Sequence, residues 1–112
     1  MKILHADDYP VWFERIGPSF KDHEYLTVES GDEAMTLLGS GFDIVITDYN
    51  MPGNTSGVDV ALRALELGIE NVCIFTSDPS SAERELGERG SVPIFTKGNN
   101  LAIAAWIESL LS

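Results

Sequence analysis

Short runs of apolar and β-branched residues recur along the chain and alternate with segments of helical length. Five runs have the near-continuous apolar character of strands that are buried on both faces of a sheet. They cover residues 3–6, 25–28, 44–47, 72–76 and 92–96. Between them, apolar residues repeat at helical spacing, as in Val58, Ala61, Leu62 and Leu65. Because strands and helices alternate, the pattern predicts an α/β fold with a parallel sheet and helices on both of its faces.

Polar residues at the expected helix starts agree with this partition. Ser30 and Ser80 are each followed three residues later by a glutamate, which is the pattern of a capping box. Asn99 or Asn100 is expected to cap the last helix, and Pro10 suits the first turn of the first helix.

Glycine and proline predict where the helices end or bend. Gly39, Gly68 and Gly90 each follow a helical segment and are expected to end it. The pair Gly17 and Pro18 falls inside the first helical segment, where a proline costs about 3 kcal/mol. We therefore expect a short or bent first helix.

Length and composition narrow the class of protein. The 112 residues suit one domain, residues 1–112, and 44% are hydrophobic, as in folded domains. The longest apolar run covers only seven residues, 101–107, so we expect no membrane span and a cytoplasmic location. The single cysteine, Cys73, excludes an internal disulfide. Met1 is followed at once by the first strand, which favours a natural N-terminus, although a longer parent protein stays open.

The charge of the chain points away from nucleic acids. Eighteen acidic and seven basic side chains give a net charge of −11. Seven scattered cations do not supply the basic face that nucleic acid binding needs, so we expect no nucleic acid partner. The excess of carboxylates suits a divalent cation or a basic protein surface. It is equally typical of a surface that keeps a small protein soluble and monomeric.

Candidate chemistry gathers at the carboxyl ends of the predicted strands, where open parallel sheets bind ligands. Asp7 and Asp8 follow the first strand, and Asp48 follows the third. Thr76 ends the fourth strand and Lys97 follows the fifth. Three clustered carboxylates repel one another unless a cation compensates, and their oxygens suit Mg²⁺. Taken singly, each of these features is common in turns, caps and solvated surfaces.

With these residues, the sequence resembles the receiver domain of two-component response regulators over its full length. The resemblance rests on Asp7 and Asp8, the segment 30–35, the run 43–53, Thr76 and Lys97, in this order and spacing. It implies a flavodoxin-like, CheY-like fold of five βα units with strand order 2-1-3-4-5. It also implies Mg²⁺ as the cofactor and a histidine kinase or histidine phosphotransfer protein as the partner.

The resemblance assigns roles to individual residues. Asp48 is implied to be the phosphoacceptor, and Lys97 is implied to pair with a phosphoryl oxygen. Asp7, Asp8, Asp48 and the backbone carbonyl of Asn50 are implied to hold Mg²⁺. Thr76 is implied to turn its hydroxyl towards the phosphoryl group.

Two further positions bear on the chemistry of the phosphorylated state. Asn50 and Asp78 lie where receiver domains tune the lifetime of the acyl phosphate, and the pair predicts a short-lived phosphorylated state. Ser77 is an alternative hydroxyl donor to Thr76 at the site.

Three positions depart from the receiver pattern. Lys97 is followed by Gly98 instead of a cis proline, which leaves open whether this peptide bond is cis. The position three before the lysine is Ile94 instead of an aromatic residue, and the neighbouring Phe95 points to the opposite face of a strand. The loop 52–57 is one residue longer than usual. The second departure argues against the usual coupling between Thr76 and an aromatic residue on the last strand.

The function that we expect is a single receiver domain, monomeric and without an output domain in this chain. It would catalyse only its own phosphorylation and dephosphorylation, and would act by switching its binding to another protein. The alternative is a degenerate receiver that serves as a phosphorylation-independent interaction module. A haloacid-dehalogenase-like phosphatase is disfavoured because position 50 is Asn50, where that class carries a second aspartate. The kinase, the target and the pathway stay open.

Overall fold

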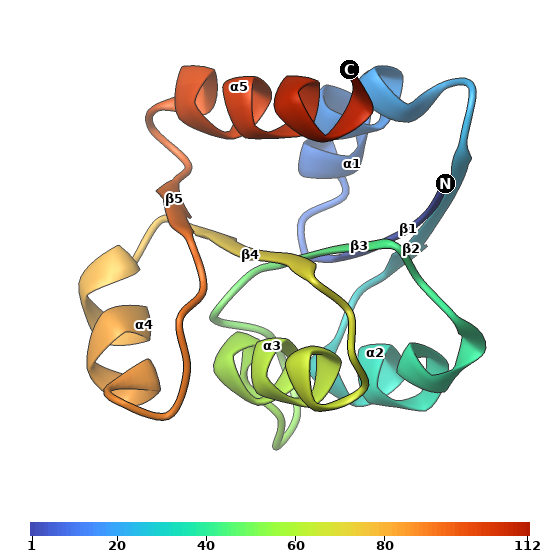
Figure 1. The fold of residues 1–112 in the computed structure, drawn as a ribbon. Coiled ribbons are helices and arrows are strands. Elements are labelled where there is room, and N and C mark those ends of the chain that lie inside the picture. The colour runs from blue at the N-terminus through green and yellow to red at the C-terminus, as the bar shows by residue number, and fades with distance from the viewer.

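The computed structural model describes residues 1–112 and contains one five-stranded sheet between two layers of helices (Figure 1). The strands are β1 (Lys2–Ala6), β2 (Glu24–Val28), β3 (Ile44–Thr47), β4 (Asn71–Thr76) and β5 (Ile94–Thr96). The helices are α1 (Val11–Ile16), α2 (Gly31–Leu37), α3 (Gly57–Glu66), α4 (Pro79–Leu86) and α5 (Asn100–Leu111). All paired strands are parallel in the order β2-β1-β3-β4-β5, which confirms the predicted fold class and strand order.

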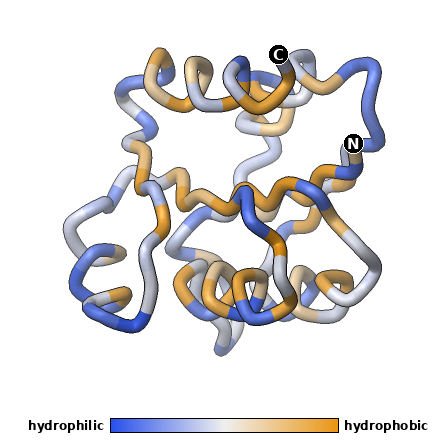
Figure 2. Tube along the Cα trace, in the orientation of Figure 1, coloured by the Kyte–Doolittle hydropathy of each residue, from blue (hydrophilic) through white to orange (hydrophobic).

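The core is divided by the sheet into two clusters. Helices α1 and α5 cover one face, and α2, α3 and α4 cover the other (Figure 1). Side chains alternate along each strand, so Val45 and Ile74 pack towards α2–α4 while Ile46 and Phe75 pack towards α1 and α5. The strands are accordingly mostly hydrophobic along their length (Figure 2). This packing on both faces fixes the sheet whose carboxyl edge carries the site.

The first helix is short, as predicted. It ends at Ile16, and a 3₁₀ helix covers Gly17–Phe20, with Pro18 in its first turn. The turn places Phe20 fully in the core beneath β2, where its ring stacks on Tyr25. No helix in the structure is long and apolar enough to span a bilayer.

Two helix boundaries differ from the prediction. The cap of α4 is Asp78, whose carboxylate accepts the backbone N–H of Ser81, so the predicted capping box at Ser80 is wrong. Pro79 starts this helix because proline at the first helical position loses no intrahelical hydrogen bond. The helix ends at Gly87 and not at Gly90.

The predictions for the ends of α2 and for the start of α5 agree with the structure only in part. Gly39 lies inside a short 3₁₀ helix, and Gly41 takes the left-handed conformation that ends the turn. Ser30 caps α2 as predicted by accepting the N–H of Glu33. Asn99 precedes α5 but makes no side-chain capping bond.

The last strand is shorter than the predicted run 92–96. It begins at Ile94, because Pro93 has no N–H to donate to a strand partner. The carbonyl of Pro93 still accepts the N–H of Ile74 on β4, which holds the segment against the sheet. The strand therefore ends in the predicted place and delivers Lys97 to the carboxyl edge.

Candidate functional site

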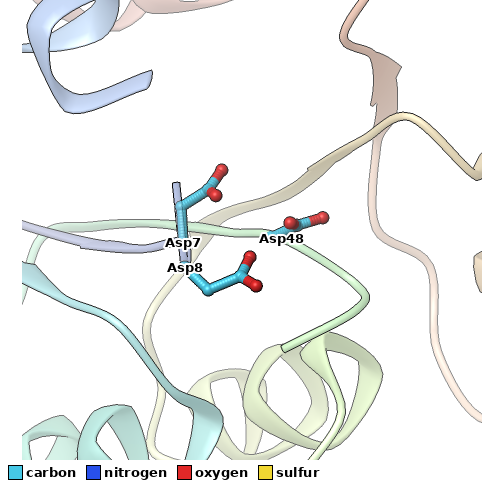
Figure 3. Close-up of side chains that lie close together, drawn as sticks. All are labelled: Asp7, Asp8 and Asp48. Atoms are coloured by element: carbon cyan, nitrogen blue, oxygen red, sulfur yellow. The ribbon is translucent and has the colours of Figure 1, made fainter. Parts of the chain in front are cut away.

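Three carboxylates meet at the carboxyl edge of the two central strands. Asp7 and Asp8 follow β1 and Asp48 follows β3, and each offers an oxygen within 4.8 Å of the others. Figure 3 shows the three side chains extending in the same general direction from neighbouring strand ends. The sheet hydrogen bonds continue here, since the N–H of Asp48 donates to the carbonyl of Ala6 at 2.8 Å. The strand pairing therefore positions the cluster.

Lys97 brings a positive charge to this cluster from the end of β5. Its Nζ lies 2.8 Å from Oδ2 of Asp7 and 3.0 Å from Oδ2 of Asp48, and its side chain is only 7% exposed. The backbone N–H of Lys97 donates to the carbonyl of Thr76, which aligns the start of this segment with β4. A buried ion pair of this kind keeps both partners in position, because separating them would leave an uncompensated charge in the interior at a high cost in free energy.

The two oxygens of Asp48 have different surroundings. The backbone N–H of Tyr49 donates to Oδ1 at 2.7 Å, whereas Oδ2 is paired with Lys97. These contacts fix the plane of the carboxylate. Asp48 also lines an open pocket.

The cluster has the properties expected of a site for a divalent cation. Oδ1 of Asp8 is buried and has no hydrogen bond partner, a state that costs free energy unless a ligand satisfies it. Burial raises the pKa of Asp7, although the hydrogen bond from Lys97 opposes this effect. Three carboxylates with only one lysine between them leave negative charge uncompensated. Hard oxygen ligands in this number suit Mg²⁺, and the residues present therefore fit this ion.

A pocket of about 470 Å³ collects most of the predicted site residues. Asp8, Asp48, Asn50, Thr76, Ser77 and Lys97 all line it. Tyr9, which precedes α1, and Val11 and Trp12 in its first turn complete the wall. Asp7 adjoins the pocket through its ion pair with Lys97. Residues from four separate parts of the sequence thus share one cavity, as the strand-end argument predicted.

Thr76 and Asp78 form the start of the loop into α4. The hydroxyl oxygen of Thr76 accepts the N–H of Asp78 at 3.1 Å, which leaves the hydroxyl proton free for another acceptor. The carboxylate of Asp78 is engaged as the cap of α4 and is not part of the pocket wall. The effect of Asp78 on the phosphorylated state therefore stays a prediction.

A polar bridge between Asp48 and α4 was not predicted from the sequence. Tyr49 follows Asp48 directly, and its hydroxyl donates to Oε1 of Glu85 on α4 at 3.0 Å. The hydroxyl of Ser56, the cap of α3, donates to Oε2 of the same glutamate. Glu85 lies 36 residues beyond Tyr49, and no sequence pattern indicates such a contact. We call these three residues, Tyr49, Ser56 and Glu85, the Tyr49–Glu85 bridge.

The structure shows the conformation at each of the three positions that depart from the receiver pattern. The peptide bond between Lys97 and Gly98 is trans, as are all others. Ile94 packs towards α4, and Phe95 packs on the opposite face against Trp106 of α5, so the two side chains do point to opposite faces. The loop 52–57 is tied to α2 because the hydroxyl of Thr55 donates to Asp32.

Comparisons with known proteins were made for the sequence and for the fold. No family model matches the chain. The chemotaxis protein CheY of Pseudomonas aeruginosa is 39% identical over 69 residues. The aligned segment covers 58% of this chain and 54% of that relative, so the match spans about half the length of the curated relative.

Solved structures share the fold over nearly the whole chain. The response regulator TrrA from Thermotoga maritima, in complex with Mg²⁺ and BeF, is 27% identical, with a TM-score of 0.75 over 98% of this chain and 99% of that one. A response regulator receiver protein from Sinorhizobium medicae is 24% identical, with a TM-score of 0.81 over 99% of this chain and 93% of that one. In fold, and over about half of its length in sequence, the chain is similar to CheY-like receiver domains of response regulators.

Proposed function

We propose that the chain accepts a phosphoryl group on Asp48 from a phosphohistidine of a histidine kinase or histidine phosphotransfer protein. The observation that carries this proposal is the contact of Lys97 with both Asp7 and Asp48 beside the unpartnered oxygen of Asp8. A carboxylate in an open pocket is thereby surrounded by groups that can neutralise a phosphoryl group. We expect the reaction to take place in the cytoplasm, and the phosphorylated chain would change its affinity for a downstream protein.

The transfer is a substitution at phosphorus. An oxygen of Asp48 forms the new O–P bond while the P–N bond to the histidine breaks. The nitrogen leaves with the bonding electron pair, so a protonated ring is released as neutral imidazole. Lys97 then exchanges its contact with Oδ2 of Asp48 for one with a phosphoryl oxygen, and the free hydroxyl proton of Thr76 is available to another. Ser77, which lines the same pocket, is the alternative donor.

Asp7, Asp8, Asp48 and the backbone carbonyl of Asn50 would hold Mg²⁺. When bound, this ion neutralises negative charge on the transferring phosphoryl group. Asp8 is the ligand with the clearest vacancy, because its Oδ1 has no other partner. Asp7 is already paired with Lys97 and would hold the ion through the water molecules bound to it.

We further propose that the chain promotes only its own phosphorylation and dephosphorylation. Water attacks the phosphorus of the aspartyl phosphate, releases inorganic phosphate and restores the Asp48 carboxylate. Asn50 lines the pocket and is suited to orient this water, with Asp78 nearby at the start of α4. The expected result is a phosphorylated state that decays within minutes at neutral pH. A phosphorylated protein that persisted for hours with Mg²⁺ would contradict this expectation.

The test is intact mass spectrometry after incubation with acetyl phosphate, with Mg²⁺ or with a chelator. A phosphoryl adduct that needs the metal and is absent in Asp48→Asn would support the proposal. If no adduct forms, a Mg²⁺-dependent beryllofluoride complex would still show a competent site with a short-lived product. The absence of both would contradict the proposal and favour a phosphorylation-independent interaction module.

A further inference from the structure

The ammonium of Lys97 has a third neighbour besides the two carboxylates. Nζ lies 5.1 Å from the centre of the Trp12 ring, within the range of a cation–π interaction. The lysine side chain is only 7% exposed, so most water has been removed from this contact. An aromatic ring attracts a cation more strongly when the pair is desolvated. The three neighbours, Asp7, Asp48 and Trp12, together determine where the charge sits.

The backbone hydrogen bond of Lys97 to Thr76 aligns the start of this segment but does not fix the direction of the lysine side chain. The strand before it has three residues, and the peptide bond to Gly98 is trans. A Cβ placed on Gly98 would meet nothing within 4 Å, so this side of the lysine is open. A lysine side chain is long and flexible, and its position must then come from its contacts.

Trp12 is itself held firmly. Its ring meets Phe75 of β4 edge to face, with centroids 5.2 Å apart and an angle of 86°. On α1, the guanidinium of Arg15 lies 5.6 Å from the same ring. The ring also lines the pocket that contains Asp48. The Trp12 ring is thus held between Phe75 of β4 and Arg15 of α1, beside the ammonium of Lys97.

We propose that Trp12 is a positioning residue that keeps the Lys97 ammonium directed at the group on Asp48. This inference rests on the proposed function, because it concerns the same reaction. During phosphoryl transfer Lys97 must leave Oδ2 of Asp48 and meet a phosphoryl oxygen. The contacts with Asp7 and with the indole ring persist during this change, so the ammonium turns within the pocket and does not swing into solvent. In this role Trp12 acts through Lys97, whose ammonium it contacts.

The kinetic test compares Trp12→Leu, which removes the aromatic face, with Trp12→Phe, which keeps a smaller one. The chain has two tryptophans, and Trp106→Phe is the matched control because Trp106 of α5 packs on Phe95 of β5 and does not line the pocket. With acetyl phosphate and saturating Mg²⁺, Trp12→Leu should phosphorylate about tenfold more slowly, the size of a desolvated cation–π contact. Trp12→Phe should recover most of the rate, and Trp106→Phe should match the parent. The concentration of Mg²⁺ that gives half the maximal rate should stay within about twofold.

A background that lacks the ammonium separates positioning from a general structural effect. In Lys97→Met, which should itself be slow, adding Trp12→Leu should change the rate little, because no ammonium is left to position. A Trp12→Leu protein at the parental rate, or an equal loss in the Lys97→Met background, would overturn the role of Trp12. A parent that forms no adduct and no beryllofluoride complex would overturn the proposed function and this inference with it.

A second readout uses a variant that keeps Trp12 in its native packing. In Trp106→Phe, indole fluorescence reports Trp12 alone. Binding of beryllofluoride with Mg²⁺ should change the emission because the ammonium turns against the ring while it stays in contact with it. Lys97→Met in the same background should lose most of this change. Emission that stays constant while mass spectrometry detects the complex would contradict the contact.

Discussion

The residues that meet the candidate site from the α1/α5 face of the sheet are aromatic and packed, whereas those from the α3/α4 face are polar and half-exposed. On the first face, Trp12 packs on Phe75 and stands beside Lys97. On the second, the Tyr49–Glu85 bridge joins the residue after Asp48 to α4 by hydrogen bonds. The same carboxylate is thus approached by two kinds of contact with different energetic properties.

This difference indicates which contacts stay in place when Asp48 reacts and which contacts can rearrange. Burial of an aromatic ring contributes free energy that is lost only when the core opens. A hydrogen bond between partly exposed groups contributes about 0.5–1.5 kcal/mol net, because water replaces either partner when the bond breaks. We infer that the α1/α5 face holds the geometry of the reaction. The α3/α4 face can rearrange at low cost when the charge on Asp48 changes.

Removal of the Phe75 ring should have the largest effect on stability. Phe75 is completely buried under Trp12, and Phe75→Ala should lower the free energy of unfolding by about 3–5 kcal/mol. Denaturant unfolding measures this loss. Leu101→Ala is the control, since Leu101 is 82% exposed and should change the free energy by less than about 0.5 kcal/mol. A loss below about 1 kcal/mol for Phe75→Ala would show that this face is not the rigid one.

The start of α3 tolerates no side chain at Gly57. A Cβ there would lie 1.7 Å from the carbonyl oxygen of Asp48, so the helix or the site must move. Gly57→Ala should cost about 3 kcal/mol and slow phosphorylation as well. Gly98→Ala is the matched control near the site, because a Cβ at Gly98 meets nothing within 4 Å. If both alanine variants were equally stable, the close approach of α3 to Asp48 would be disproved.

Acid should weaken the α1/α5 face through a buried histidine. His5 is fully buried beside Phe13 and Tyr25, and desolvation, helped by the charge of Lys97, lowers its pKa to about 3. The unfolded chain takes up this proton below a pKa of about 6.5, whereas the folded protein resists it, so stability falls as the pH drops from about 6.5 towards 3. At pH 5 the loss is about 2 kcal/mol.

Denaturant unfolding of the parent and of His5→Gln at pH 7 and pH 5 tests this prediction. The difference between the two pH values should be smaller in His5→Gln by about 2 kcal/mol. The raised pKa of Asp7 acts in the opposite direction at lower pH in both proteins and cancels in the comparison. An unchanged pH dependence in His5→Gln would exclude the histidine as the source.

The bridge on the α3/α4 face should contribute least to stability. Tyr49→Phe and Glu85→Gln should each lower the free energy of unfolding by at most about 1 kcal/mol. Tyr9→Phe serves as the control, because Tyr9 is 64% exposed. A double-mutant cycle of Tyr49→Phe and Glu85→Gln should show a coupling energy of similar small size. A cost above about 2 kcal/mol would mean that the bridge is a fixed part of the core.

The sequence was sufficient to predict the sheet and most of the residues of the site. Apolar strands and intervening helices specify a parallel sheet, and the ends of parallel strands necessarily share one edge. This is why Asp8, Asp48, Thr76 and Lys97 could be placed together without a structure. Strand order came from the resemblance to receiver domains, since periodicity does not determine which strands are neighbours.

Contacts that depend on side-chain direction across distant segments were not predictable. Trp12 lies in a helix that starts three residues after Asp8, but its orientation towards Lys97 follows from the packing on Phe75. The partner of Tyr49 depends on where α4 begins. That start was misplaced, because Ser80 matched a capping box while Asp78 and Pro79 formed the actual cap.

Hydrogen–deuterium exchange with and without beryllofluoride and Mg²⁺ tests the contrast between the two faces most directly. The account predicts altered exchange in residues 49–57 and 77–87, which contain the bridge and α4. It predicts little change in residues 11–20 and 100–111, which cover the α1/α5 face, and no change anywhere in Asp48→Asn. A larger change in residues 11–20 or 100–111 than in α4 would contradict it.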